Sequence, residues 1–116
     1  MPFLDALPRL TERAWAAQVD KLARMFGWGM WRDNATNAPR RCPRCKAEIH
    51  LPRNTPGWPD RVYVRGEDLL FVEFKTDRNY PTADQRGWLD ALRQVKRVGV
   101  AVWKPRQVEE VMRTLR

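Results

Sequence analysis

Histidine and cysteine are scarce in this sequence, and their scarcity limits the metal chemistry open to the chain. The 116 residues include one histidine and two cysteines. A structural zinc site usually takes four Cys or His ligands, so the count does not support a complete site within one chain. Long apolar runs are also missing: none approaches a membrane span, and the N-terminus lacks the apolar region of a signal peptide. We therefore expect a cytoplasmic protein with no membrane partner, in the host cytoplasm if the source is viral.

Acidic residues are outnumbered by basic ones. The chain has 22 Lys and Arg against 14 Asp and Glu, which gives a net charge of +8 and an isoelectric point near 10.3. A basic protein of this size usually meets a polyanion, and nucleic acid is the first candidate. The alternative is a basic surface that serves only solubility. Hydrophobic content of 43% is ordinary for a globular protein, and we expect residues 1–116 to form a single domain.

The segment from Leu69 to Lys75 predicts a β-strand that ends in charge. Because side chains alternate along a strand, Glu73 and Lys75 share one face. The alternate residues are apolar and are expected to point into the core: Leu70, Val72 and Phe74. A buried acid and a buried base are costly unless they pair or bind a metal. The end of this strand is therefore the first candidate for a functional site.

A predicted hairpin brings a second carboxylate to the same place. Residues 61–65 alternate and predict a strand, and residues 66–68 predict the hairpin loop, since its glycine tolerates a positive φ. Asp60 then starts one strand where Glu73 ends its antiparallel neighbour. Just before Asp60, Gly57 lets the chain bend tightly. Two carboxylates with an amine two residues further on suit a hard divalent cation, Mg²⁺ or Mn²⁺, and a water molecule.

The remaining elements complete a mixed α/β pattern. Apolar spacing predicts a helix from Thr11 to Phe26, and residues 28–32 predict the first strand. A helix opens at Thr82, and residues 100–103 form a short strand that should lie parallel to a neighbour because a helix precedes it. A last helix follows Pro105, so the order is α-β-β-β-α-β-α, with a mixed central sheet flanked by helices. The inward stripes of the three helices are expected to be Trp15, Val19, Leu22 and Phe26, then Trp88, Leu89, Leu92 and Val95, then Val108, Val111, Met112 and Leu115.

Three features together resemble the PD-(D/E)xK nucleases. They are Gly57-Trp58-Pro59-Asp60, Phe71-Val72-Glu73-Phe74-Lys75, and Gln85 with the apolar residues Trp88, Leu89 and Leu92 after it. The similarity is greatest to the small stand-alone branch of virus-type replication-repair nucleases (VRR-NUC), and it covers nearly the whole chain except a cysteine-containing insertion. It implies a restriction-endonuclease-like core and a metal-dependent endonuclease that hydrolyses DNA. Branched DNA such as a Holliday junction, or duplex DNA, would be the substrate, and a homodimer the assembly.

The resemblance also assigns roles at the hairpin. Asp60 and Glu73 would hold Mg²⁺ or Mn²⁺ with help from the main-chain carbonyl of Phe74. Lys75 would orient the attacking water or screen charge in the transition state, and the sequence does not decide between these roles.

Two further polar residues have both a structural and a functional interpretation. Gln85 follows Thr82 by three residues, which matches a capping box; by resemblance, it orients the phosphate or the attacking water. Glu12 falls on the apolar stripe of the first helix. It either favours the helix N-terminus by its charge or leans over the sheet toward the two carboxylates, as a glutamate of the first helix does in the family.

An insertion at about 33–56 departs most from the family pattern. It holds Cys42, Cys45 and His50. A Cys-x-x-Cys pair is half of a Zn²⁺ site, which His50 and then a second chain, a carboxylate or water would have to complete; two free thiols or a disulfide are the alternatives. Basic residues surround the pair and are interpreted as phosphate contacts to nucleic acid: Arg40, Arg41, Arg44 and Lys46.

Two other functions compete with a nuclease. The first is a module of nuclease fold that grips nucleic acid without cutting it, although Asp60, Glu73 and Lys75 are all present. The second is a zinc-stabilised adaptor built around Cys42 and Cys45.

Overall fold

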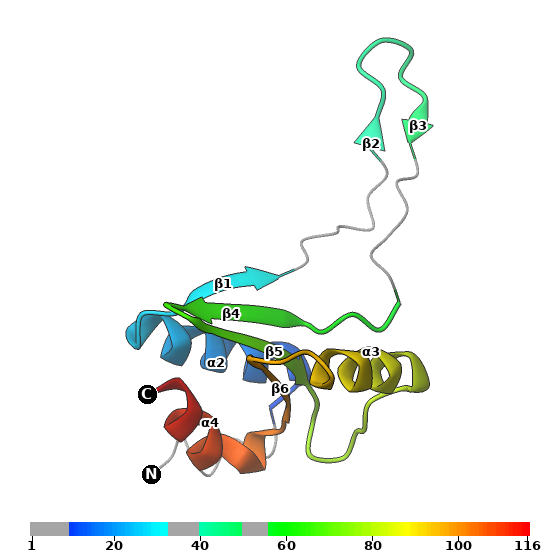
Figure 1. Ribbon diagram of the computed structural model, residues 1–116. Helices are drawn as coiled ribbons and strands as arrows, with labels where there is room; N and C mark the ends of the chain where they lie inside the picture. The colour runs from blue at the N-terminus through cyan, green and yellow to red at the C-terminus, as the bar shows by residue number, and fades with distance from the viewer. Residues whose placement is uncertain (1–9, 33–39, 50–55) are drawn as a thin grey trace.

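The computed structural model describes residues 10–32, 40–49 and 56–116, which form a mixed α/β fold (Figure 1). The elements in chain order are α2 (Glu12–Met25), β1 (Gly29–Arg32), β2 (Arg40–Arg41), β3 (Glu48–Ile49), β4 (Arg61–Arg65), β5 (Asp68–Phe74), α3 (Ala83–Arg93), β6 (Val98–Trp103), the 3₁₀ helix η2 (Pro105–Gln107) and α4 (Val108–Leu115). A four-stranded sheet has the order β1-β4-β5-β6, and β2 and β3 form a separate two-stranded sheet. Apart from that second sheet, the predicted order of elements is confirmed.

The hairpin of β4 and β5 is antiparallel and turns where the sequence indicates. Gly66 in the turn has a φ of +59°, in the left-handed region that glycine adopts readily. The register pairs Arg61 with Val72. Asp60, which precedes Arg61, therefore lies beside Glu73, which follows Val72. On its other side β5 pairs with β6. This pairing is parallel, as expected, because α3 carries the chain back to the end of the sheet where β5 begins.

The main core lies between one face of the sheet and helices α2 and α4. The indole N–H of Trp15 donates a 3.0 Å hydrogen bond to the Trp103 carbonyl, and that of Trp28 donates a 2.8 Å bond to the Leu115 carbonyl. Each buried indole therefore has the partner that it needs. The inward alternation predicted for β5 is confirmed, and the buried residues of that strand's core face are Leu70, Val72 and Phe74.

The opposite face of β5 packs against α3 through aromatic rings. Trp58 makes edge contacts with Phe71 and Trp88, at centroid distances of 5.8 and 5.0 Å. Leu89 is buried as predicted, but the prediction for Val95 is wrong, since this residue is 52% exposed. The helix ends before Val95, so helical spacing no longer applies there.

Gly57 should not tolerate even an alanine. Its φ is +85°, and a Cβ would lie 2.5 Å from the main-chain carbon of Asp84 in the first turn of α3. We expect Gly57→Ala to lower the free energy of unfolding by about 1–3 kcal/mol, measured by urea denaturation. Gly87→Ala is the matched control: a Cβ there meets nothing within 4 Å, so alanine in mid-helix should stabilise by about 0.5–1 kcal/mol. Equal effects of the two variants would contradict the prediction.

Candidate functional site

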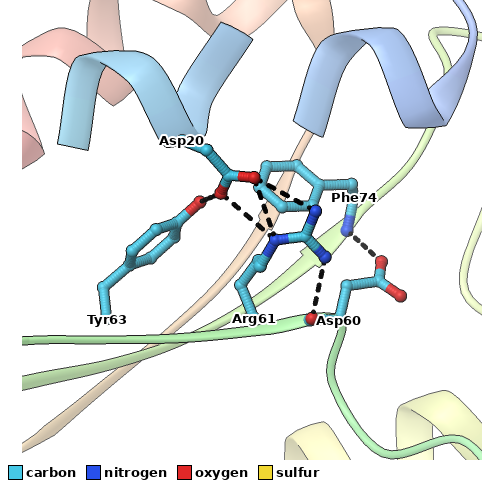
Figure 2. Close-up of polar contacts among 5 residues, drawn as sticks. All are labelled: Asp20, Asp60, Arg61, Tyr63 and Phe74. Atoms are coloured by element: carbon cyan, nitrogen blue, oxygen red, sulfur yellow. Dashed lines mark hydrogen bonds and ion pairs between the residues drawn. The ribbon is translucent and has the colours of Figure 1, made fainter. Parts of the chain in front are cut away.

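Asp60 is fixed at the open end of the hairpin by both strands (Figure 2). Its Oδ2 accepts a 2.9 Å hydrogen bond from the main-chain N–H of Phe74 on β5. Its main-chain carbonyl accepts a 3.0 Å bond from the guanidinium of Arg61 on β4. The carboxylate is thus held against the main chain beside Glu73, one residue before Phe74.

Glu73 is an almost completely buried acid, with 1% of its surface exposed. Its Oε1 accepts a 2.7 Å hydrogen bond from the side-chain amide of Gln85, while Oε2 is buried without a partner among the described residues. Burial and then the neighbouring carboxyl of Asp60 raise the pKa of Glu73 to about 8, while the positive charge of Lys75 opposes the rise. A cation placed here would replace the proton that Glu73 otherwise keeps near neutral pH.

Lys75 lies between two carboxylates. It is 8% exposed, and its Nζ is 3.8 Å from Oε1 of Glu73 and 3.6 Å from Oε1 of Glu12. Glu12 reaches Lys75 because the Thr11 side chain caps α2, accepting a 3.1 Å bond from the Ala14 N–H. Glu12 thus lies in the first helical turn and also contacts Lys75 at the hairpin end, while a role for it in the chemistry of the site stays a prediction.

Gln85 likewise has two contacts at once. Its Oε1 accepts a 2.8 Å bond from the Thr82 N–H, which completes the predicted capping box. Its Nε2 donates to Glu73, as described above. The cap fixes the amide, and the amide fixes one oxygen of the buried acid, so α3 helps to orient Glu73.

The Asp60–Glu73 pair offers a hard cation two of its ligands. Mg²⁺ keeps several water ligands and is commonly bound through one or two carboxylates. The unpartnered Oε2 of Glu73 is a buried acceptor that a cation would satisfy. Within residues 10–32, 40–49 and 56–116, no group of three or more Asp, Glu, His or Cys is arranged to hold a metal. The Phe74 carbonyl and water would have to supply the remaining ligands.

Asp20, which the sequence interpretation missed, anchors the site to α2 (Figure 2). Its carboxylate is 3.1 Å from Nε of Arg61 and accepts a 2.7 Å hydrogen bond from the hydroxyl of Tyr63. Burial, then the contact with Asp20, raises the pKa of Tyr63 far above its usual range, so the hydroxyl stays a donor. The signal in the sequence was an acid directly after Val19, on the edge of the apolar stripe of α2.

The cysteine pair lies in the turn between β2 and β3. Cys42 and Cys45 are free thiols, so they do not form a disulfide. Main-chain hydrogen bonds from Cys45 and Arg44, and then the Cys45 side chain, lower the pKa of Cys42. The Lys46 N–H donates a 3.0 Å bond to the Cys42 carbonyl, with Lys46 at a φ of +61°. This turn favours a thiolate at Cys42.

The other residues predicted in the insertion are placed only in part. His50 lies outside the described residues, as does the side chain of Arg40. Arg41, Arg44 and Lys46 are exposed, and they belong to the β2–β3 hairpin rather than to the sheet that carries Asp60 and Glu73.

The pKa of Glu73 predicts an unusual pH dependence of stability. In the unfolded chain its pKa is near 4.5, and in the fold it is about 8, so the folded state binds the extra proton between these values. Without divalent cations, stability should therefore fall as pH rises from about 5 to about 8, by up to ~1.4 kcal/mol per unit. Thermal melts in EDTA at several pH values would measure it. Glu73→Gln should lack this component; parallel wild-type and variant curves would contradict the prediction.

Comparisons with protein-family models, curated proteins and solved structures found no match to this chain. In the described part of the chain, no helix has both the length and the apolar character needed to cross a membrane.

Proposed function

We propose that the chain is a metal-dependent endonuclease with a restriction-endonuclease-like core, which hydrolyses phosphodiester bonds in DNA. The observation that carries the proposal is the buried Glu73, placed beside Asp60 and Lys75 with one oxygen unpartnered. A structural role alone gives no reason to bury an acid next to a second acid at this cost. The mixed four-stranded sheet, the hairpin that brings Asp60 beside Glu73 and the resemblance to the PD-(D/E)xK nucleases support the proposal.

Each site residue has a task in this proposal. Asp60, Glu73 and the Phe74 carbonyl would bind Mg²⁺ or Mn²⁺, which supplies a Lewis acid for the phosphoryl oxygen and lowers the pKa of bound water. Lys75 places a positive charge beside the carboxylates, where it orients the attacking water or screens the transition state. Gln85 holds Glu73, and Glu12 holds Lys75, so both act as positioning residues.

The net charge of +8 supports a polyanionic substrate. Branched or duplex DNA and a homodimer are part of the proposal through the resemblance alone. The competing function is a DNA-binding module of the same fold that no longer cuts. An experiment can distinguish the two functions, because the binding module would bind DNA without forming any cleavage product.

The test is a panel of end-labelled DNAs, namely four-way junction, flap, nicked duplex, duplex and single strand, incubated with Mg²⁺ or Mn²⁺. Cleavage that EDTA abolishes would support the nuclease, and mapped cuts would define the substrate class. Binding without cleavage of any substrate would favour the binding module. Cleavage that continues in EDTA would contradict the proposed metal site.

We also propose that Cys42 and Cys45 bind Zn²⁺. The lowered pKa of Cys42 favours the thiolate that zinc requires. The described residues supply only these two of the usual four ligands, so the site would be completed elsewhere, as in a second copy of the chain. A hairpin with two residue pairs is marginal alone, and a metal would stabilise it.

Metal analysis of the purified protein tests the zinc proposal. We expect about 0.5 Zn²⁺ per chain if two copies share four thiolates, and about one if a single chain closes the site. Cys42→Ser should lose the zinc. Lys46→Gly, which keeps both thiols and relieves the positive φ, should retain it. Zinc-free wild-type protein, with unchanged folding of Cys42→Ser, would refute both the site and the adaptor function.

A further inference from the structure

Lys104 is a buried cation without an ion-pair partner in the described part of the chain. The residue is 5% exposed, and its Nζ is buried without a hydrogen-bond partner among the described residues. None of the ion pairs in the described part of the chain includes it. The ring of Tyr80 lies against the ammonium, with its centroid 3.9 Å from Nζ. A cation–π contact offsets only part of the cost of burying an ammonium, so the site is suited to an arriving anion.

The position of Lys104 relates it to the candidate nuclease site. It follows the last residue of β6, as Lys75 follows the last residue of β5, and the two strands pair in parallel with Phe74 opposite Trp103. The Lys75 N–H also donates a 3.1 Å bond to the Trp103 carbonyl, so the pairing extends to this point. Neighbouring strands lie about 4.8 Å apart. Lys104 therefore begins one strand spacing away from Lys75.

The backbone also gives the two lysines a common direction. Lys104 has an extended conformation, with a φ of −114° and a ψ of 153°, so the alternation of β6 continues through it. Trp103 belongs to the core on the α2 face. The side chain of Lys104 accordingly points to the other face of the sheet, which is the face that carries Glu73 and Lys75.

Tyr80 covers the ammonium from a loop that is itself anchored. Asp77 in this loop accepts a 3.1 Å hydrogen bond from the Arg106 N–H. The main chain of Lys104 is fixed as well, because its N–H donates a 2.9 Å bond to the Gln107 side chain. Tyr80 is 72% exposed despite its contact with Lys104. An exposed aromatic ring beside a phosphate site is available to stack on a base.

We propose that Lys104 and Tyr80 form a subsite for the DNA backbone next to the proposed cleavage site. A phosphate of the bound strand would take the place of the Tyr80 ring against the ammonium, and the ring would move aside to stack on an adjacent base. This inference rests on the proposed function for the identity of the anion, but it concerns binding rather than hydrolysis.

The test is binding of fluorescent duplex and single-stranded DNA in EDTA, where no cleavage is expected, over a series of salt concentrations. Lys104→Met should weaken binding about tenfold at low salt and reduce the slope of log K against log salt by about 0.7–0.9, the loss of one phosphate contact. Lys104→Arg should keep the slope. The matched control is Lys96→Met, an exposed lysine before the opposite end of β6.

The tyrosine has a separate signature. Tyr80→Ala should weaken binding of single strands about tenfold while leaving the salt slope unchanged, because the cation remains. If Lys104 has only a structural role, Lys104→Met should match Lys96→Met in DNA affinity and in salt slope. That result would overturn the proposal. Thermal melts check folding, and the arginine variant gives a second measurement if the methionine variant does not fold.

Failure of this inference can be told apart from failure of the proposed function. Wild-type protein that binds DNA but never cuts it would remove the nuclease and leave the subsite testable. Wild-type protein that cuts, with Lys104→Met indistinguishable from Lys96→Met, would remove the subsite alone. Wild-type protein that does not bind DNA in any form would overturn both.

Discussion

Glu73→Gln is expected to reduce DNA cleavage by about 1000-fold or more while leaving the protein at least as stable as wild type at pH 8. A metal acting as Lewis acid is worth several kcal/mol in the transition state, and about 4 kcal/mol corresponds to that factor. The free energy of unfolding should stay the same or rise, because the new amide can still accept the bond from Gln85 and carries no charge to bury beside Asp60. Opposite effects on activity and stability are typical of a residue kept for function.

Single-turnover cleavage of the best substrate, together with urea denaturation at pH 8, would measure both effects. Glu67→Gln makes the same chemical change on an exposed residue in the turn at the far end of the hairpin, and it should change neither quantity appreciably. Cleavage by Glu73→Gln within tenfold of wild type would contradict the assignment. A large loss of stability in this variant would instead indicate that Glu73 is a structural residue.

The geometry of the candidate site could be predicted from sequence because its determinants are local. Alternation along β5 separates Glu73 from Val72 without knowledge of the rest of the fold, and the turn at Gly66 sets the register that brings Asp60 opposite. The capping box of Thr82 was visible in the same way, since it depends on residues three apart. Residues close together in the sequence determine the direction of these side chains, so the hairpin and the start of α3 could be predicted without knowledge of the tertiary structure.

Other parts of the site depend on contacts between distant segments, which spacing alone does not reveal. Arg61 is one of two arginines in the strand predicted over residues 61–65, and its pairing with Asp20 joins positions 41 apart in the chain. Lys104 and Tyr80 are equally ordinary in sequence, and their contact arises only because β6 ends beside β5. The error at Val95 has a local cause, since a helical pattern was continued past the end of α3. Whether a charged side chain is buried depends on the tertiary structure, so the role of such a side chain can be inferred only when its contacts are known.

Asp20→Ala is expected to be the most destabilising single change near the site, lowering the free energy of unfolding by about 3–5 kcal/mol. The Asp20 and Arg61 side chains are 7% and 14% exposed, so the change leaves a nearly buried guanidinium without its anion. It also removes the acceptor of the buried Tyr63 hydroxyl. Urea denaturation would measure the loss. Asp90→Ala is the matched control, because its pair with Arg93 is at the same kind of distance, 3.2 Å, but mostly in solvent, and its removal should cost less than about 1 kcal/mol.

The same variant should affect the site before it unfolds the protein. Arg61 uses one guanidinium nitrogen to hold the Asp60 carbonyl and the rest of the group to bind Asp20, so a guanidinium released from α2 no longer fixes the start of β4. Cleavage by Asp20→Ala, assayed at a temperature where its melting curve shows a folded protein, should therefore fall, and more metal should be needed to restore it. The double variant Asp20→Ala/Arg61→Met should be more stable than Asp20→Ala alone, since it removes the unpaired charge. If the double variant were instead less stable by the sum of the two single losses, the ion pair would not be the cause.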